Sequence, residues 1–511
     1  MPPNRARALI LALLLTGACS EADEATSSDG PSTSTGGSST GSATGTGGAG
    51  TGGAGTGGSA AAGAAGQSCL DGTELDTLSV TGDESDLTEG THAETDPTTF
   101  ANQATQSCHP ELRGGFGAST RCGLDGDIIR VTTLEDDADS IVPGSLREAL
   151  QASGPRIVVF EVSGAILLES QLAVTDPYVT IAGQTAPPPG ISLYHEQFRI
   201  QTHDVCVQHV RMRPGDRHAD GSAVTATEAG DRHTLLVSAS GGGGHHIVLD
   251  NVSLSWSHDE TIALLAGVAD VTVRDSIIAE PLHDSVHDTA GHSYCFLGAE
   301  ANRVAVLGNV IAHCRRRYPR ADGGAWMMVN NVMYNPGDYV IHGHLPADYT
   351  VVGNVLDFPS DPAAWVNGGA EALVSNRHDD IHAYFLDNLI PSARVLHEFR
   401  GPATVPLTVE PVPRVWVGDV TAVTGASVEP DLVDHVGAFP RYRDEVDTRV
   451  IDDLAARAGG YVDSQDDVGG YPAVAANNRA LTPPSNLRGD DDGDGVENVV
   501  EWLQSFVDAI E

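Results

Sequence analysis

Lysine is missing from this 511-residue sequence, and all 28 of its basic residues are arginines. Asp and Glu number 70, so the formal net charge is −42. An acidic chain without a basic stripe has nothing to offset phosphate repulsion, which argues against a nucleic-acid binder. Aromatic residues make up only 5%, and no apolar run approaches the roughly 18 residues of a spanning helix. With 58 glycines, this composition favours short strands and many turns over a large helical bundle.

Residues 1–19 are predicted to be an export signal. Arg5 and Arg7 precede an apolar stretch at 8–15 that is too short to span a bilayer. The following Leu-Thr-Gly-Ala-Cys at 15–19 resembles a bacterial lipoprotein signal, in which Cys19 would be lipidated, although the leucine stands four rather than three residues before the cysteine. An ordinary signal peptide cut near Cys19 is the alternative. Both predict a secreted or cell-surface protein, and lipidation predicts an anchor in the bacterial outer membrane.

Residues 20–68 are predicted to be a linker, because their Gly, Ser, Thr and Ala side chains bury too little to offset the entropy of ordering. Six further cysteines follow it, at Cys69, Cys108, Cys122, Cys206, Cys295 and Cys314. Export permits disulfides, and six cysteines allow about 15 pairings. We favour the local pair of Cys108 with Cys122. No C-x-x-C pair occurs, which disfavours a zinc site.

A short phrase recurs from about residue 205: apolar residues, a polar corner that often holds Asn, and apolar residues again. The marked corner positions are His209, Asn251, Ser276, Asn309, Asn331, Asn354 and Asn388, with spacings of 42, 25, 33, 22, 23 and 34 residues. The shortest spacings suit one coil of a right-handed parallel β-helix, and the longer ones suit a coil with an inserted loop. We therefore predict an all-β solenoid of this kind rather than separate domains.

The repeated Asn residues are interpreted as structural. Asn tolerates the left-handed conformation of a tight corner. Its side chain can also hydrogen-bond to the Asn of the next coil and so satisfy buried amides. We therefore expect an Asn ladder along one corner, not a row of ligands.

Several phrases in a fixed order resemble one family. They include Ser-Leu-Ser-Trp-Ser-His-Asp-Glu at 253–260 and Arg-Tyr-Pro-Arg at 317–320, with others at 114–120, 131–134, 143–150, 156–164, 180–187, 277–282, 292–294 and 436–444. Together they resemble the pectate lyases of polysaccharide lyase family 1 over roughly residues 112–475. The resemblance implies a right-handed parallel β-helix. It also implies cleavage of α-1,4-galacturonan by calcium-assisted β-elimination, which leaves an unsaturated product.

β-Elimination needs a base that removes the proton on C5 of a uronate, and a cation on the neighbouring carboxylate makes that proton more acidic. Arg317 occupies the Arg of the family's Arg-x-Pro phrase, so the resemblance implies that it is the base. A free guanidinium is a poor base, but the flanking Arg315, Arg316 and Arg320 would weaken its hold on the proton. Arg316 is in addition a candidate to bind substrate. A solvated positive patch is the alternative for this arginine run.

Further candidates for the substrate groove come from the same resemblance. Arg320 can hold a substrate carboxylate in a bidentate pair. Asp322 replaces an Arg that many relatives carry, and no Lys is present to assist. His292 lies near the place of that Lys and is predicted to be catalytic, with a structural role as the alternative. Glu280 and His283 are predicted to line the groove, with a capped strand end as the alternative.

Calcium takes several oxygen ligands, so its site should gather carboxylates. Asp259 and Glu260 are the best pair, with a simple acidic turn as the alternative. Asp250 and Asp231 are further candidate ligands. His233 stands where relatives often carry an Asp, and Asp231 is two residues away.

A second calcium site is predicted at residues 490–501, which have the spacing of an EF-hand-like loop of about 12 residues. The ligands would be Asp490, Asp492, Asp494, Asn498 and Glu501. An amphipathic helix is predicted at 496–510, with its apolar side formed by Val499, Val500, Leu503, Phe506 and Val507. A simple charge run is the alternative for the loop.

The predicted organisation has six parts: an export signal at 1–19, a linker at 20–68, a lead-in at 69–111, a β-helix lyase domain at 112–400, its C-terminal part at 401–480, and the calcium loop and helix at 481–511. The predicted partner of this monomer is an acidic polysaccharide such as polygalacturonate or pectin, and its only membrane contact would be the lipid anchor. Two other functions remain open. One is a non-catalytic surface protein that binds pectin or matrix glycans. The other is a β-helical hydrolase, which would need two acids flanking the scissile bond.

Overall fold

The computed structural model describes residues 114–399, 407–417 and 420–511. The predicted export signal with Cys19, the linker and the lead-in with Cys69 and Cys108 lie outside these residues. Within the described ranges, no helix combines the length and the apolar character needed to cross a membrane.

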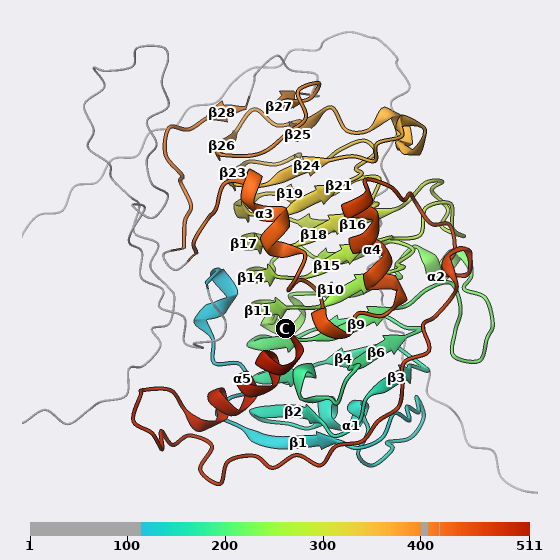
Figure 1. Ribbon diagram of the computed structural model, residues 1–511, viewed down its shortest axis with the longest axis vertical. Helices are drawn as coiled ribbons and strands as arrows, with labels where there is room; N and C mark the ends of the chain where they lie inside the picture. The colour runs from blue at the N-terminus through green and yellow to red at the C-terminus, as the bar shows by residue number, and fades with distance from the viewer. Residues whose placement is uncertain (1–113, 400–406, 418–419) are drawn as a thin grey trace, which may run out of the picture. The chain divides into compact units, whose positions relative to one another are not determined.

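Three parallel sheets, which the chain visits in turn, make up the body of the molecule (Figure 1). Sheet I contains β1 (Asp127–Val131), β2 (Arg156–Phe160), β5 (Val179–Ala182), β8 (Val205–Gln208), β11 (His245–Asp250), β14 (Ala269–Arg274), β17 (Asn302–Leu307), β20 (Gly324–Val329), β23 (Ala347–Val352), β26 (Ile381–Leu386) and β28 (Thr408–Val409). Sheet II contains β3 (Gly164–Leu167), β6 (Ile191–Tyr194), β9 (Val210–Arg213), β12 (Ser253–Ser255), β15 (Ile277–Ala279), β18 (Val310–Ala312), β21 (Val332–Tyr334) and β24 (Val355–Asp357). Sheet III contains β4 (Leu172–Val174), β7 (Phe198–Ile200), β10 (Leu235–Val237), β13 (Glu260–Leu264), β16 (Tyr294–Ala299), β19 (Arg320–Asp322), β22 (Ile341–Gly343), β25 (Ala372–Asn376) and β27 (Val395–Phe399).

Helices are few and lie outside the coils. The α-helices are α1 (Leu146–Gln151), α2 (Ala226–Ala229), α3 (Gly425–Leu432), α4 (Glu445–Ala456) and α5 (Asn498–Ile510). Short 3-10 turns are η2 (Phe116–Ser119), η3 (Gly183–Thr185), η4 (Ser240–Gly242), η5 (Pro362–Ala364), η6 (Val366–Gly368), η7 (Pro440–Tyr442) and η8 (Gln465–Val468). The fold is therefore the predicted right-handed parallel β-helix, and the C-terminus of the chain adds a short helical extension.

The core is a stack of apolar rows inside the coils. In sheet I, for example, Ile247, Val271, Val304, Trp326 and Tyr349 face one another in strict register and are buried. One coil cannot bury its own apolar face, so each coil depends on the coils above and below it. This dependence explains why the apolar phrase recurs along the sequence.

The predicted Asn ladder runs along the corner between sheets I and II. Asn309 donates to Asn331 (2.9 Å), Asn331 to Asn354 (3.0 Å) and Asn354 to Asn388 (3.0 Å), each from Nδ2 to Oδ1. Ser276 continues the row, because its amide N–H donates to Asn309 Oδ1 (3.0 Å). The ladder residues thus satisfy one another, as the sequence predicted.

The left-handed corner residue and the ladder residue are two adjacent positions, not one as predicted. Residues with positive φ stand directly before the ladder, at Asp275 (φ 48°), Gly308 (φ 63°), Asn330 (φ 56°), Gly353 (φ 63°) and Asp387 (φ 50°). Asn251 (φ 48°) belongs to this first position. Because Asn251 lies beside Asp275 and not Ser276, the coil between them is 24 residues long, as the pairing of Ile247 with Val271 confirms.

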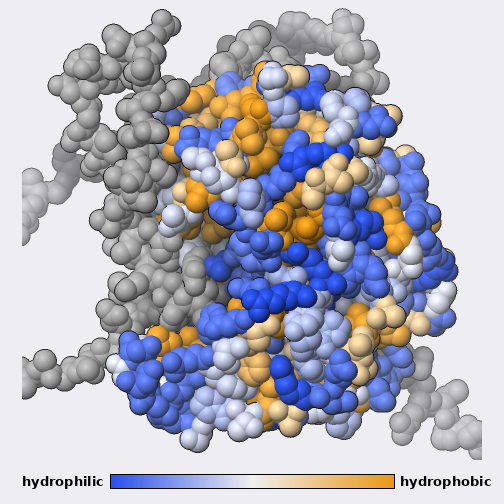
Figure 2. Space-filling model, in the orientation of Figure 1, coloured by the Kyte–Doolittle hydropathy of each residue, from blue (hydrophilic) through white to orange (hydrophobic). Residues whose placement is uncertain are grey.

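The C-terminal segments cover two faces of the β-helix. Helices α3 and α4 lie over sheet II, where Val428, Leu432, Val450 and Leu454 form one apolar cluster with strand residues such as Val310. Figure 2 shows a mostly hydrophilic face here, with apolar patches between the helices. The predicted apolar side of α5 packs against sheet I, where its buried members contact a cluster that includes Ile157, Val159 and Ala182.

Two disulfides are present among the described residues, joining Cys122 to Cys206 and Cys295 to Cys314. The predicted pair of Cys108 with Cys122 is therefore wrong. Sequence proximity misled that prediction, because Cys122 follows η2, which lies against β11 and β14, and so reaches β8. The second bridge holds the corner that carries the arginine run.

Candidate active site

The two predicted catalytic residues, Arg317 and His292, and the predicted calcium ligands Asp259 and Glu260 converge where neighbouring strands of sheet III begin. Glu260 is paired with Tyr294, and Tyr294 with Arg316 on the next coil. His233 lies in line with Glu260 on the preceding coil, because Leu235 is paired with Ile262. Parallel strands are about 4.8 Å apart, so residues distant in sequence touch here.

Glu260 is the centre of this group and is only 3% exposed. Arg317 Nη1 donates a charge-assisted hydrogen bond to Glu260 Oε1. On the other side, His233 Nδ1 lies 3.2 Å from Glu260 Oε2. Glu260 is thus held between a guanidinium and an imidazole, and the buried carboxylate is compensated.

Asp259 lies beside Glu260 and is partly open to solvent. Its Oδ1 is 2.9 Å from His292 Nε2, and its Oδ2 is 3.9 Å from His233 Nε2. Burial raises the pKa of the Asp259 carboxyl. The hydrogen bond with His292 and the charges of His233, His292 and Arg317 lower it by more, so the net shift is downward. Asp259 is therefore ionised at neutral pH.

A group of aromatic rings orients the two candidate catalytic side chains. The Arg317 guanidinium lies over the Tyr294 ring at 4.4 Å, a cation–π contact. The His292 ring contacts the same Tyr294 ring (3.9 Å) and stacks on His287 (3.9 Å). Tyr294 therefore lies between Arg317 and His292.

The arginine run is not a solvated patch. Arg315 Nε and Arg316 Nε lie 2.8 and 2.7 Å from Asp338 Oδ2, and Arg317 is paired with Glu260. Arg316 also lies over the rings of Tyr294 (5.6 Å) and Tyr339 (5.3 Å). Each of these arginines thus has a carboxylate partner.

Arg320 lies on the outer face of β19, with 18% of its side chain exposed. Its Nε contacts Asp322 Oδ2 at 2.5 Å, and Asp322 Oδ1 accepts from the amide N–H of His344 (2.7 Å). The register places His342 of β22 beside Arg320. Burial and the nearby cations lower the pKa of the His342 imidazole well below its ordinary value, so His342 adds no positive charge at neutral pH.

The corner at residues 313–319 is held rigidly. The disulfide from Cys314 reaches Cys295 on β16. The Tyr318 hydroxyl donates to Cys314 O (2.8 Å) and accepts from the Cys314 amide N–H (2.8 Å). The amide N–H of Phe296 donates to Arg317 O (2.8 Å). These contacts fix the backbone that presents Arg317.

Asp231 lies at the border of the site, with its carboxylate turned to solvent and to Arg199. Asp231 Oδ2 accepts from Arg199 Nη2 (2.7 Å), and Oδ1 lies 3.7 Å from His233 Nε2. His233 therefore stands between Asp231 and Asp259. Burial lowers the pKa of the His233 imidazole more than the neighbouring aspartates raise it.

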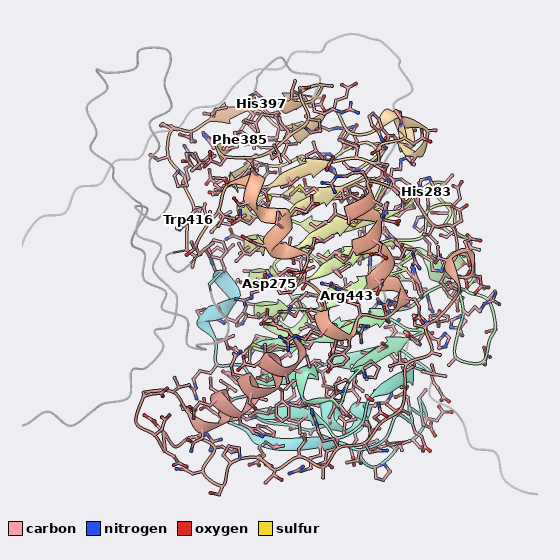
Figure 3. The ribbon with its side chains drawn as sticks, viewed as in Figure 1. Asp275, His283, Phe385, His397, Trp416 and Arg443 are labelled. Atoms are coloured by element: carbon pink, nitrogen blue, oxygen red, sulfur yellow. A yellow bond between two sulfur atoms is a disulfide. The ribbon has the colours of Figure 1, made fainter. Side chains whose placement is uncertain are left out.

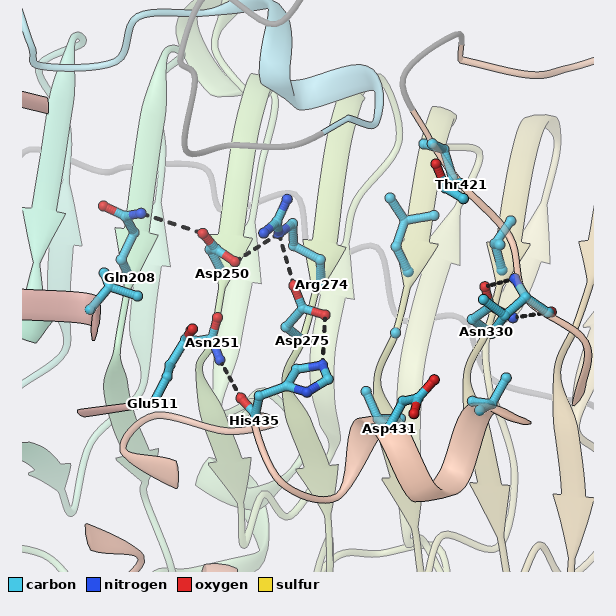
Figure 4. Close-up of a pocket in the computed structure, with 18 of the residues that line it drawn as sticks. Gln208, Asp250, Asn251, Arg274, Asp275, Asn330, Thr421, Asp431, His435 and Glu511 are labelled. Atoms are coloured by element: carbon cyan, nitrogen blue, oxygen red, sulfur yellow. Dashed lines mark hydrogen bonds and ion pairs between the residues drawn. The ribbon is translucent and has the colours of Figure 1, made fainter. Parts of the chain in front are cut away.

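Asp250, a predicted calcium ligand, lies in a different place. It ends β11 in sheet I and accepts from Arg274 Nε (2.8 Å) and Gln208 Nε2 (3.3 Å). Figure 4 shows these contacts at the rim of a pocket of about 670 Å³ beside the ladder corner, with His435 near Asp275. The structure therefore does not bring Asp250 to Asp259 and Glu260.

Glu280 and His283, predicted to line the groove, have other partners. Glu280 is buried after β15 of sheet II, where its two oxygens accept from Arg449 Nε (2.9 Å) and Nη2 (2.6 Å) of α4. This pair attaches α4 to the β-helix. His283, labelled at the right of Figure 3, has its Nδ1 2.7 Å from the Oγ of Ser293, which follows His292 in sequence. Only His283 is thus placed near the site.

The C-terminal loop brings three of its predicted ligands together. Asp490, Asp492 and Asp494 are exposed, with one oxygen of each within 4.8 Å of the others. Asn498 is buried at the start of α5, with its amide bonded to Asn486 O (2.7 Å) and to the Asp491 N–H (3.1 Å). Partial desolvation and the neighbouring loop aspartates raise the pKa of the Glu501 carboxyl.

Several residues of the site were missed in the sequence. His287, Asp338 and Tyr339 were not singled out, and Tyr294 was quoted only as part of a phrase. One signal was available: the loop from 283 to 292 holds three histidines in ten residues. Asp338 and Tyr339 gave none, since only the stacking of coils brings them to the arginine run.

Comparison with known proteins gives relatives of one kind. No protein-family model matches the chain. The probable pectate lyase C of Emericella nidulans is 35% identical over 227 residues, which span 44% of this chain and 47% of that protein. The probable pectate lyase C of Aspergillus flavus is 28% identical over 401 residues, or 76% of this chain and 85% of that protein.

The similarity thus spans about half of the first relative and most of the second. A crystal structure of Jun a 1, the major allergen from cedar pollen, aligns with 63% of this chain and 92% of its own, at 17% identity and a TM-score of 0.48. The longer sequence alignments include relatives with the same name from Aspergillus fumigatus. The chain is therefore similar to proteins named probable pectate lyase C over about three quarters of its length, at 28% identity.

Proposed function

We propose that the chain is a lyase that cleaves α-1,4-galacturonan, or a similar acidic polysaccharide, by β-elimination at the sheet III site. One observation carries the proposal: Arg317 is ion-paired with Glu260 and shares the Tyr294 ring with His292, which is bonded to Asp259. The names of the curated relatives support the same activity. The two-acid hydrolase is disfavoured, since Glu260 is ion-paired with Arg317 and Asp259 is bonded to His292.

The reaction needs no water in the cleavage step. A base takes the proton from C5, and the electron pair of that C–H bond becomes the C4–C5 double bond. The C4–O glycosidic bond breaks, and the departing oxygen takes up a proton. Arg317 is assigned as the base, which requires its guanidinium first to lose a proton to solvent and its bond to Glu260 to loosen when substrate binds. His292 is assigned to move a proton nearby, a role to which imidazole is suited near neutral pH.

The balance of charge in the groove explains why a cation would help. Arg315 and Arg316 are opposed by Asp338, Arg317 by Glu260, and Arg320 by Asp322. A polyuronate would meet nearly neutral pairs rather than a positive surface. Arg320 and Arg316 are assigned to hold substrate carboxylates, and His283 to border the groove. Glu280 takes no part, since it binds Arg449.

Calcium fits the carboxylates of this site but not its imidazole. Asp259 and Glu260 would hold the ion, with further oxygens from substrate and water, because calcium takes about 6–8 oxygen ligands. Bound to a substrate carboxylate, calcium supplies the positive charge that acidifies the C5 proton. His233 Nδ1 has no hydrogen bond among the described residues, but an imidazole nitrogen is a poor calcium ligand. The site should therefore bind calcium weakly without substrate.

The direct test is turnover of polygalacturonate with calcium and with a chelator. The proposal expects ultraviolet absorbance from an unsaturated product, greater with calcium. Reducing ends without that absorbance would indicate hydrolysis. Binding without any product would indicate a non-catalytic pectin binder. This is the second candidate function, and it is favoured by the observation that every arginine of the site is paired with a carboxylate.

The exposed loop carboxylates support a second proposed calcium site, with a structural role. Asp490, Asp492 and Asp494 would hold the ion, joined by Glu501 after a small movement of its side chain. Asn498 is left out of this set, because its side-chain amide is already hydrogen-bonded to Asn486 O and to the Asp491 N–H at the start of α5. Equilibrium dialysis with labelled calcium, on the full chain and on a variant lacking Asp490 and Glu501, tests this site.

The proposed location is outside the cytoplasm, as a monomer held by a lipid on Cys19. This proposal rests on the sequence of residues 1–19 alone. Metabolic labelling with a fatty acid tests it, because Cys19→Ser should abolish the label. Label that persists in the variant would contradict the anchor.

A further inference from the structure

Four metal-binding side chains lie together at the edge of sheet I, away from the sheet III site. His203 and Asp204 precede β8, and His245 and His246 open β11. Val205 is paired with Ile247, which sets His203 beside His245 and Asp204 beside His246. Adjacent coils are only about 4.8 Å apart, so the register forms a two-by-two array of three imidazoles and one carboxylate.

The backbone gives the two coils the same shape at this corner. Asp204 and His246 both adopt the left-handed conformation, with φ of 55° and 54°. The His203 and His245 rings are parallel, with an interplanar angle of 5° and centroids 4.6 Å apart. All four side chains are partly buried, so the array is preformed rather than assembled from mobile surface groups.

Ligand atoms of His203, Asp204 and His245 lie within 4.8 Å of one another, close enough to share one ion, and His246 lies beside them. Asp204 Oδ2 is 2.5 Å from His203 Nδ1 and 3.9 Å from His246 Nδ1. His245 Nδ1 is 3.0 Å from His246 Nδ1. In a tetrahedral zinc site with bonds of 2.0–2.1 Å, ligand atoms are about 3.3 Å apart. The measured separations bracket that value.

A supporting contact fixes the carboxylate. Thr120 Oγ1 donates to Asp204 Oδ1, which leaves Oδ2 directed at the imidazoles, an arrangement common around metal ligands.

We propose that His203, Asp204 and His245, joined by His246 after a rotation of its side chain, form a binding site for a divalent transition metal such as zinc. Three imidazoles and one carboxylate suit zinc, nickel or copper rather than calcium. The metal would have a structural role, because four protein ligands leave no open position for chemistry. It would clamp two coils and Thr120 beside the disulfide from Cys122 to Cys206. The spacing of cysteines argued against zinc, but these ligands are histidines.

The test uses the full chain, stripped of metal and titrated with cobalt(II), whose visible spectrum reports tetrahedral nitrogen ligation, and then with zinc in competition. Because His287 and His292 could also bind cobalt near Asp259, the matched control is His287→Gln. We expect one tight site in wild type and in the control. His203→Gln with His245→Gln should lose more than tenfold in affinity, since even outer-sphere partners contribute about 10- to 100-fold.

Unchanged tight binding in the double variant would overturn the proposal, as would loss of that binding in His287→Gln alone. If the double variant does not fold, His246→Gln and anomalous diffraction from zinc-soaked wild-type crystals decide. Zinc density among the four side chains supports the site, and density only at Asp259 refutes it. The outcome is separable from the lyase proposal, which is measured with calcium and substrate.

Discussion

Two rows of polar side chains run along the same β-helix, one at the ladder corner between sheets I and II and one where sheet III begins. The ladder stacks like upon like: Asn309, Asn331 and Asn354 each satisfy the next. The sheet III row places unlike groups in register, such as Glu260 with Tyr294. In the ladder, identical neutral side chains satisfy one another's hydrogen bonds, so the row is structural. In the sheet III row the neighbours are unlike and charged, and their ion pairs are of a kind that a bound cation or polyanion can rearrange.

Arg317→Lys is the change expected to have the largest effect on the sheet III row. The lysine would keep the charge but lose the planar guanidinium that contacts both Glu260 and Tyr294. Loss of a base reduces kcat by about 10²–10⁴, with a smaller change in KM because Arg320, the proposed contact for a substrate carboxylate, is unchanged. Steady-state kinetics on polygalacturonate measure this.

Arg315→Lys is the matched control, because Arg315 contacts Asp338 and not Glu260. If both variants retain activity alike, the arginines act only through charge, and the base is another residue.

In the ladder, Asn331→Ala should strongly destabilise the fold and spare the activity of the folded fraction. The change removes the acceptor of the buried Asn309 amide N–H, and such an unsatisfied group costs about 1–3 kcal/mol, whereas Asn354 Oδ1 still accepts from the amide N–H of residue 331. Chemical denaturation measures the free energy of unfolding. Asn388→Ala, at the less buried end of the ladder, should cost less. Equal losses would mean that position along the ladder does not matter.

His233→Asp sharpens the calcium assignment in the sheet III row. A carboxylate in place of the imidazole adds oxygen ligands next to Asp259 and Glu260. The calcium concentration that gives half-maximal activity should therefore fall by about tenfold. Titration of activity with buffered calcium measures the change. An unaltered calcium requirement would place the ion elsewhere.

How far the sequence predicts each row follows from how the row is built. The ladder repeats one residue at a regular spacing, so the repeat alone predicted both the β-helix and the amide chain. Even there, the left-handed corner at Asn251 was assigned to the neighbouring ladder position, because both positions hold Asn.

The sheet III row has no such repeat. Asp259, Glu260 and Arg317 came from a family resemblance, and the contact between Glu260 and Arg317 depends on the register of stacked coils. The same register separates Asp250 and Glu280 from the site and brings in Asp338. Sequence spacing cannot supply this information, because inserted loops vary the length of each coil.

Removal of the C-terminal loop ligands should have a small effect. Asp490→Ala with Glu501→Ala should release one calcium ion and loosen α5, which covers the far end of sheet I. Activity should survive, because α5 does not contact the sheet III site. A folded double variant without any turnover would contradict a structural role.

The smallest expected effect concerns pH at the ladder corner. Burial lowers the pKa of His209 more than Asp250 raises it. Below about pH 6.5, the ordinary pKa of histidine, the unfolded chain therefore binds more protons than the folded chain. The free energy of unfolding should fall as the pH drops through that value. His209→Asn should remove this part of the pH dependence, since Asn tolerates the same left-handed corner at Asn251 and Asn330. Denaturation curves at neutral and mildly acidic pH measure it.

The central claim is that the sheet III row cleaves by elimination, and digestion of polygalacturonate in heavy-oxygen water tests it most directly. Mass spectrometry of the fragments should show unsaturated ends and no heavy oxygen, because elimination adds no water across the broken bond. Arg317→Lys should yield far less of the same product. Heavy oxygen at the new ends would show hydrolysis, and a bound but intact polymer would show a binding protein; either result would contradict the account.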